Sequence, residues 1–323
     1  MRGLFVNTRK INIMTSSDER LLPQLKVQME AISRNLPMRY VNFFLFHDGK
    51  APKIVESLHF FAENYVNLHF SDVVIKQPDM YNSLSTLGGA EWGGAAYYSL
   101  CAYQYLPSEI DRILYLDAGD TLILDNIDNF YFADFHGRSL LATPVCFKDG
   151  GGYPVLFGKN DLFDSAHTAR ILRGLFNSGS YVINLEKARM VGLTIEDYWQ
   201  FAKALCSLTG KETNVYWGDQ GFLSALFVGD IHFFRYPEIK NLWYMPYNFC
   251  LWYFDRMIQK VDYKPYILHY AGVSFKPWYG AYPIFCERFQ ERGKLHDLNE
   301  LKLGQAEYYY LWHEYAILAE QKK

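Results

Sequence analysis

Short apolar runs alternate with helix-like segments along the chain. Strand-like runs bounded by turn-forming residues lie at 11–14, 41–46, 66–70, 113–117, 139–143, 181–185, 231–234 and 266–270. Apolar residues at helical spacing predict helices over 19–34, 52–64, 91–106, 195–208, 219–227 and about 305–319. In the first of these helices the apolar positions are Leu22, Leu25, Met29 and Ile32. Strand–helix alternation over the first half predicts an α/β fold with a mostly parallel sheet covered on both faces.

The composition narrows the class of protein. The chain has 323 residues, 50% hydrophobic and 21% charged, which is enough for one large domain or two smaller ones. A net charge of −3 gives no electrostatic footprint for nucleic acid, so we expect no nucleic-acid partner. The 5 cysteines form no CxxC pair, which favours reduced thiols in a cytoplasmic protein.

The two ends of the chain bear on its location. The first residues contain no apolar stretch typical of a signal peptide, and no window approaches the ~18 apolar residues of a membrane span. The last part is rich in aromatic and charged residues and predicts an appended helical segment. These aromatic residues either pack against the main domain or contact the inner face of the plasma membrane as a peripheral anchor. A glycine-rich stretch at 147–160 is either a loop over a site or an ordinary surface loop.

Two carboxylates interrupt the apolar pattern where a predicted strand ends. The run Ile113–Leu116 stops at Asp117 and Asp120, and a second apolar run begins at Leu122. Ligands of open α/β sheets bind at the carboxyl ends of strands. Two carboxylates on one turn can share a divalent cation, which in turn neutralises phosphates. In the alternative interpretation, Asp117 caps a turn and Asp120 faces solvent.

Three further segments place polar residues beside predicted strands or helices. Asn177-Ser178-Gly179 is a predicted turn before a strand, where Asn177 either presents its amide to hydroxyls or satisfies its own backbone. Asp219 and Gln220 open an apolar helix, which Asp219 could simply cap. A strand ends at His269, and Lys276 follows a glycine turn. Two Asp, one His and one Lys at strand ends fit a metal-bound diphosphate, and imidazole with carboxylates favours Mn²⁺ over Ca²⁺.

The order of these segments resembles the retaining glycosyltransferases of family 8, which include glycogenin-like and bacterial galactosyl- and glucosyltransferases. The resemblance covers nearly the whole chain. The segments that carry it are the opening strand and turn up to Asp18, Tyr115–Asp120, Asn177–Gly179 with Ile183–Leu185, Asp219-Gln220, and His269–Trp278.

This resemblance implies a fold, an activity and a set of site residues. The fold would be of the GT-A type, a Rossmann-like nucleotide-sugar-binding sheet in a catalytic domain at 1–280, followed by a helical C-terminal extension at 281–323. The activity would be a retaining hexosyl transfer, dependent on Mn²⁺ or alternatively Mg²⁺. The donor would be a UDP-sugar, with glucose or galactose as the sugar, and the acceptor a glycan or glycolipid of bacterial surface polysaccharide, lipopolysaccharide or glycoprotein glycan synthesis.

By the same resemblance, Asp117, Asp120 and His269 would bind the metal, and Asp219 and Gln220 would be the catalytic pair at the donor sugar. The residues implied to bind the donor are Thr15, Ser17, Asp18, Leu116, Asp117, Ala118, Asn177, Ser178, Gly272 and Lys276.

Four departures from the family pattern keep alternatives open. Gly119 is an additional residue within the metal motif, and Leu21 stands where a base-stacking tyrosine is expected. The arginine expected before the metal strand is missing, with Ser99 near its place, and Phe275 lengthens the glycine-to-lysine spacing by one residue. The second hypothesis is therefore a catalytically silent relative that binds a nucleotide-sugar or glycan, with a metal motif altered at Gly119.

Overall fold

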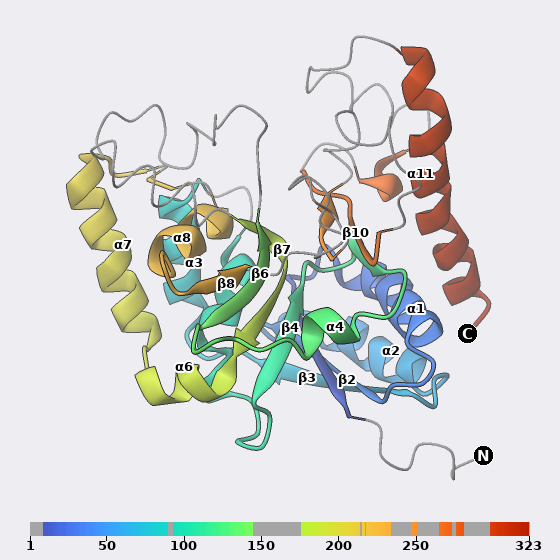
Figure 1. The fold of residues 1–323 in the computed structure, drawn as a ribbon, viewed down its shortest axis with the longest axis horizontal. Coiled ribbons are helices and arrows are strands. Elements are labelled where there is room, and N and C mark those ends of the chain that lie inside the picture. The colour runs from blue at the N-terminus through green and yellow to red at the C-terminus, as the bar shows by residue number, and fades with distance from the viewer. Residues whose placement is uncertain are drawn as a thin grey trace.

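A seven-stranded sheet forms the centre of the molecule (Figure 1). The computed structural model describes residues 9–89, 93–144, 176–213, 215–216, 218–233, 247–250, 265–272, 276–280 and 298–322. The strand order is β3 (Leu68–Val74), β2 (Val41–His47), β1 (Ile11–Ser16), β4 (Arg112–Leu116), β7 (Phe176–Asn184), β6 (Leu140–Pro144) and β8 (Ile231–Phe233). The first four strands are mutually parallel, β7 is antiparallel to both neighbours, and β6 and β8 are parallel. The prediction of an α/β fold with a mostly parallel sheet is confirmed.

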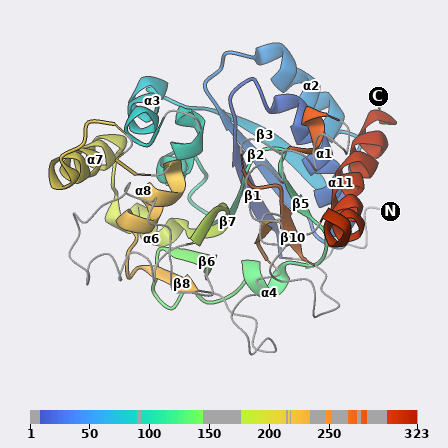
Figure 2. The same cartoon turned by 90° about the horizontal axis from the view of Figure 1, so that it is seen from above.

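Two apolar cores lie on opposite faces of this sheet, because side chains alternate along each strand. In β4, Ile113 and Tyr115 join one core, whereas Leu114 and Leu116 join the other. The helices that cover the first face are α3 (Pro78–Leu87), η2 (Gly94–Gln104), α6 (Leu185–Val191), α7 (Ile195–Thr209) and α8 (Gly218–Leu226). Those on the second are η1 (Leu22–Gln24), α1 (Leu25–Asn35), α2 (Pro52–Ala62) and α4 (Asp128–Tyr131). Figure 2 shows the two groups of helices on either side of the strands.

A second, three-stranded sheet lies beside the carboxyl end of β4. Its order is β5 (Thr121–Ile123), β10 (Ile267–His269) and β9 (Phe249–Cys250). The register pairs His269 with Thr121 on the antiparallel side and with Cys250 on the parallel side. This small sheet therefore places His269 next to the turn that carries the two aspartates.

The C-terminal helix α11 (Leu298–Glu320) packs against α1. Tyr309 and Trp312 are buried in a third apolar cluster with Val27 and Ala31 of α1. The predicted helix over about 305–319 is confirmed and begins earlier, at Leu298. Among the described residues, no helix combines the length and hydropathy that a membrane span requires.

Some predicted elements were wrong in kind or extent. The predicted helix over 91–106 is a 3₁₀ helix, η2, with non-helical backbone at Cys101. Strand β7 begins at Phe176, so Asn177-Ser178-Gly179 lies within the strand and not in a turn before it. After a register shift between Ala142 and Pro144, β6 pairs Pro144 with Phe176 at the start of β7. Helices α3, α4 and α6 and the two-residue strand β9 were not predicted. The glycine-rich stretch 147–160 lies outside the described residues.

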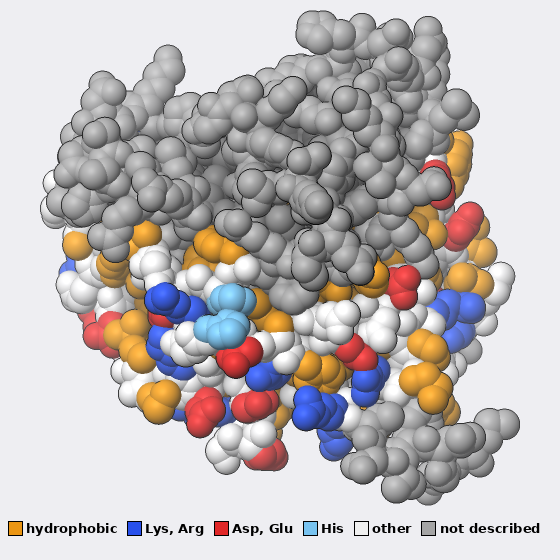
Figure 3. Space-filling view, in the orientation of Figure 1, with side chains coloured by type: hydrophobic (Ala, Val, Ile, Leu, Met, Phe, Trp, Pro, Cys, Tyr) orange, Lys and Arg blue, Asp and Glu red, His pale blue; other side chains and the backbone are white. Residues whose placement is uncertain are grey.

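Acidic and basic side chains are interspersed over the described part of the face in Figure 3. Among the described residues, several opposite charges form ion pairs, such as Lys187 with Asp230 at 2.6 Å and Arg39 with Asp128. Opposite charges in these pairs thus neutralise each other locally.

Candidate metal and donor site

The turn between β4 and β5 brings Asp117 and Asp120 together. Gly119 adopts a φ of 72°, and a Cβ at this position would lie 2.4 Å from Cβ of Gln24. Only glycine fits such a position without displacing its neighbours. The additional residue in the motif is thus accommodated by a left-handed glycine. Asp120 is 6% exposed, so the interpretation in which it faces solvent is wrong.

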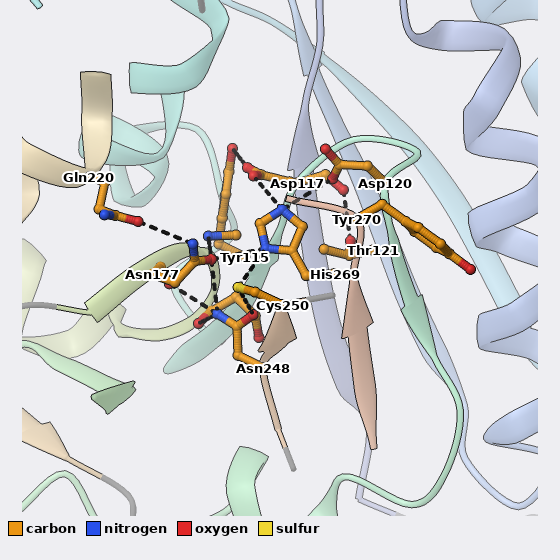
Figure 4. Close-up of polar contacts among 12 residues, drawn as sticks. Tyr115, Asp117, Asp120, Thr121, Asn177, Gln220, Asn248, Cys250, His269 and Tyr270 are labelled. Carbon is orange, nitrogen blue, oxygen red and sulfur yellow. Dashed lines mark hydrogen bonds and ion pairs between the residues drawn. The ribbon is translucent and has the colours of Figure 1, made fainter. Parts of the chain in front are cut away.

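His269 completes a cluster of three metal-ligating side chains (Figure 4). Its Nε2 lies 3.3 Å from Oδ2 of Asp117 and 3.6 Å from Oδ1 of Asp120. One ligand atom from each residue lies within 4.8 Å of the others. Asp120 and His269 are buried, whereas Asp117 is 32% exposed and forms the open side of the cluster.

The chemistry of the cluster fits a divalent cation. Oδ1 of Asp120 is buried and accepts no hydrogen bond from the described residues. A buried oxygen without a partner costs about 1–3 kcal/mol, which coordination to a cation would remove. Two carboxylates and one imidazole are ligands that suit Mn²⁺.

A lysine adds positive charge beside this cluster. Nζ of Lys276 donates to Oδ2 of Asp120 and to the carbonyl oxygen of Tyr270, at 2.8 Å in the second case. Burial raises the pKa of Asp120, although the charges of Lys276 and His269 oppose this. Burial alone would lower the pKa of His269, but Asp120, Cys250 and Asp117 raise it to about 10. The Lys276 ammonium thus lies within reach of an anion bound at the cluster.

Gln220 lies on the opposite side of Asn177 from the metal cluster (Figure 4), and Asp219 precedes it in the sequence. Both are buried in the first turn of α8, with Asp219 8% exposed. Burial and the charge of Asp117 raise the pKa of Asp219 to about 7, although a hydrogen bond from Ser178 lowers it in part. Oε1 of Gln220 accepts from Nδ2 of Asn177 at 3.1 Å. Gln220 is thus joined to the rest of the site through Asn177, and Asp219 through Ser178.

The predicted residues of the opening strand lie at the carboxyl end of β1. Thr15 is fully buried, and the Ser17 hydroxyl donates to the carbonyl oxygen of Asp18 at 2.6 Å. Nε of Arg20 donates to both carboxylate oxygens of Asp18, at 3.1 and 2.9 Å. The structure therefore pairs Asp18 with Arg20 and does not bring it into the Asp117 cluster.

The remaining predicted residues lie next to site residues along the chain. Leu116 and Ala118 are buried on either side of Asp117. Gly272 has a φ of 103° in the segment between His269 and Lys276. Their predicted contacts with the donor remain predictions.

Several residues that hold the site were not predicted. The Tyr115 hydroxyl donates to Oδ1 of Asp117 at 3.0 Å, and Nε2 of Gln28 donates to the Asp117 carbonyl oxygen at 2.9 Å. Gln28 is a polar residue on the buried face of α1, a signal that the sequence does contain. Cys250 contacts His269 from the two-residue strand β9, and Asn248, which directly precedes this strand, contacts Cys250. Neither residue has a signal in the sequence pattern.

Comparison with known proteins agrees with this geometry. Residues 12–281 match the family described as glycosyl transferase family 8. The lipopolysaccharide 1,3-galactosyltransferase of Salmonella typhimurium strain LT2 is 24% identical over 279 residues, which cover 85% of this chain and 75% of that protein.

Solved structures show the same fold. The galactosyltransferase LgtC in complex with donor and acceptor sugar analogues has a TM-score of 0.59 and 21% identity, over 90% of this chain and 99% of LgtC. The glycosyltransferase GlyE of Streptococcus pneumoniae has a TM-score of 0.57 and 18% identity, over 97% of this chain and 63% of GlyE. The fold is thus that of the GT-A glycosyltransferases, and the chain belongs to glycosyl transferase family 8.

Proposed function

We propose that this protein is a retaining hexosyltransferase that moves glucose or galactose from a UDP-sugar to a glycan acceptor, with Mn²⁺ as its cofactor and Mg²⁺ as the alternative. The observation that carries the proposal is the cluster of Asp117, Asp120 and His269, with an unsatisfied buried oxygen on Asp120 and the Lys276 ammonium beside it. Family membership supplies the reaction class.

The cluster suits the departure of a nucleoside diphosphate. Asp117, Asp120 and His269 would hold the divalent cation, which would neutralise negative charge developing on the leaving diphosphate. Lys276 would place a second positive charge on the phosphates, together with the backbone at Gly272. Fixed charges of this kind are usually the largest single contribution to catalysis.

The remaining residues would bind and orient the donor. Asp18, with Thr15 and Ser17, lies at the end of the strand next to β4, where the base and ribose of the donor would bind; Leu116 and Ala118 would flank them. Ser178 and Asn177 would border the donor sugar.

Asp219 and Gln220 are the proposed catalytic pair. Retention of configuration requires either a carboxylate nucleophile, for which Asp219 is the candidate, or attack by the acceptor from the face of the leaving group. We favour the second route, in which the Gln220 carbonyl oxygen stabilises positive charge on the sugar and the departing phosphate accepts the proton of the acceptor.

The acceptor and location are proposed from the relatives. Because one relative is a lipopolysaccharide galactosyltransferase, we propose a bacterial surface glycan or glycolipid as the acceptor, a cytoplasmic location and peripheral contact with the inner face of the plasma membrane. We also propose that residues 1–280 form the catalytic domain and 281–323 its helical extension.

The proposal is tested by UDP release from a panel of UDP-sugars, with Mn²⁺ and with a chelator. Manganese-dependent release from one sugar is the expected result and would identify the donor. If release is absent and calorimetry with Mn²⁺ present detects no UDP binding, the proposed donor is wrong.

A further inference from the structure

Three side-chain amides, those of Asn177, Gln220 and Asn248, form a hydrogen-bond network beside His269. Asn177 lies at its centre. Oδ1 of Asn177 lies 2.9 Å from Nδ1 of His269, and Nδ2 of Asn177 donates to Gln220 at 3.1 Å. On the other side, Nδ2 of Asn248 donates to the carbonyl oxygen of Asn177 at 3.0 Å and to its Oδ1 at 3.3 Å. Figure 4 shows this network on the side of the imidazole away from the two aspartates.

The backbone fixes which way the Asn177 amide points. The backbone N–H of Gly179 donates to Oδ1 of Asn177 at 3.0 Å, and a backbone N–H can only donate. The atom it meets must therefore be the oxygen. An oxygen at this place accepts from Nδ1–H of His269, so Nε2 is the ring nitrogen that faces Asp117 and Asp120 and that would bind a cation once it loses its proton. Ligating histidines are commonly fixed in this way through the second ring nitrogen.

The imidazole is also held by close packing. A Cβ on Gly179 would lie 2.1 Å from Cε1 and 2.3 Å from Nδ1 of His269, so the ring sits directly on the β7 backbone. The sulfur of Cys250 lies 3.6 Å from Nδ1, and its thiol donates to Oδ1 of Asn248 at 3.8 Å. Asn248 is 6% exposed and His269 is 3% exposed, so water does not compete for these contacts.

We infer that Asn248 and Asn177 are positioning residues for His269, and that the amide of Asn177 joins the metal cluster to the donor-sugar side through Gln220. This inference rests on the proposed function, since it concerns the cation that His269 would bind. It assigns Asn177 a role through His269, in addition to its proposed place beside the donor sugar.

The donor and acceptor roles within this hydrogen-bond network give the inference a sharp test. Asn177→Asp keeps an acceptor for all three donors that face Oδ1 and loses only the donation to Gln220. Asn248→Asp instead turns a donor into an acceptor that faces two oxygens of Asn177. Each variant adds one carboxylate near the cluster, so an effect of charge alone would act in the same direction in both.

The experiment is a titration of the purified full-length protein with Mn²⁺, followed by electron paramagnetic resonance. Asn177→Ala is expected to weaken Mn²⁺ binding by about 10–100-fold, the usual range for partners of a metal ligand. Asn177→Asp should bind Mn²⁺ at least as tightly as the wild type. Asn248→Asp should bind it more weakly than Asn248→Ala, and Asn248→Ala more weakly than the wild type.

The control is Asn184→Ala, on the same strand. The Asn184 side chain accepts from the Lys187 backbone N–H and caps α6, so its loss destabilises the protein by about 1 kcal/mol without touching His269. Its Mn²⁺ affinity should match that of the wild type. A positioning role also predicts that excess Mn²⁺ restores turnover in Asn248→Ala.

Two outcomes overturn the inference and are distinguishable from failure of the proposed function. If Asn177→Ala raises KM for the donor while its Mn²⁺ affinity is unchanged, Asn177 contacts the sugar directly. If aspartate has the same effect on Mn²⁺ affinity at positions 177 and 248, the polarity argument is wrong. If the wild type itself binds no divalent cation, both the metal site and this inference fall.

Discussion

Single glycines decide how closely the elements approach around the metal cluster. Gly119 allows the turn between the two aspartates to lie against Gln24, and Gly179 allows β7 to contact the imidazole closely. The sequence identifies the aspartates, the histidine and the lysine as chemistry-bearing residues. It does not identify the glycines' neighbours, because these contacts join segments that are far apart along the chain.

Gly179→Ala tests the close approach of β7 to His269. The added methyl group would lie 2.1–2.8 Å from three ring atoms, so the ring must move away from its position between the carboxylates. We expect Mn²⁺ affinity to fall at least 10-fold by calorimetry. The control is Gly137→Ala: a Cβ there meets nothing within 4 Å, but the φ of 72° strains an alanine, so this variant should lose stability and keep its Mn²⁺ affinity. A Gly179→Ala protein with wild-type affinity would show that the ring position is not needed.

Asp219→Asn should change how stability depends on pH. The pKa of Asp219 in the folded protein is about 7, against ~3.9 for an unperturbed aspartate. A raised carboxyl pKa stabilises the fold below pH ~4, and this contribution is lost as pH rises through about 7. The shift is about 3 pKa units, at about 1.4 kcal/mol per unit. We therefore expect the variant to gain on the order of 4 kcal/mol relative to the wild type between pH 4 and pH 8.5. Urea unfolding of the metal-free proteins measures this, and a difference independent of pH would contradict it.

The same variant distinguishes the two routes to retention. If Asp219 is the nucleophile, Asp219→Asn lowers turnover by orders of magnitude while donor affinity stays similar. Near-normal turnover with donor and acceptor supplied would exclude that role and support attack from the face of the leaving group.

At the scale of elements, the sequence pattern predicted those whose apolar spacing is regular. Strands β1, β2 and β4 begin and end within a few residues of the predicted bounds. The prediction over 91–106 was wrong because η2 is buried on nearly every side, which leaves no amphipathic period to distinguish helix types. Helix α3 contains Asn82, Ser83, Ser85 and Thr86, which favour helices weakly. Its stability must come from packing, which a single sequence does not show.

The C-terminal helix also supports the metal turn. Nε1 of Trp312 donates to the carbonyl oxygen of Gly119 at 3.1 Å, in a buried contact. Trp312 lies beyond the residues that match the family, 12–281. The helix that follows the family region therefore fixes part of its metal motif.

Trp312→Phe tests this support. The change keeps an aromatic ring but leaves a buried carbonyl without a donor, so we expect a loss of about 1–3 kcal/mol in unfolding free energy and weaker Mn²⁺ binding. Tyr315→Phe is the control, because its hydroxyl accepts from Asn35 on α1 at 2.6 Å and does not touch the turn. It should lose stability and keep Mn²⁺ affinity. Equal Mn²⁺ affinities in both variants would mean that the turn holds without Trp312.

At the scale of the molecule, the site joins parts of the chain that lie far apart in the sequence. Asp117 and Asp120 come from the turn that follows β4 of the central sheet, His269 from the small sheet, and Lys276 from the segment beyond it. The order of motifs along the chain is sufficient to identify the family. It is not sufficient to predict the register that places His269 opposite Thr121, because this pairing depends on the packing of the whole fold.

Because these segments meet at one cation, its binding should stabilise the whole chain. Mn²⁺ at about 100 times its Kd adds about 2.7 kcal/mol if it binds only the folded state. Without the metal, UDP would meet the negative charges of Asp117 and Asp120. We therefore expect UDP alone to raise Tm little. Mn²⁺ with UDP should raise it by more than the sum of the separate shifts, because each ligand strengthens the binding of the other by the same factor.

Lys276→Gln sharpens the test, because Lys276 is an ion-pair partner of Asp120. Loss of this competing cation should maintain or increase the Mn²⁺ shift and reduce the additional shift from UDP. Simply additive shifts in the wild type would contradict a shared site for metal and diphosphate.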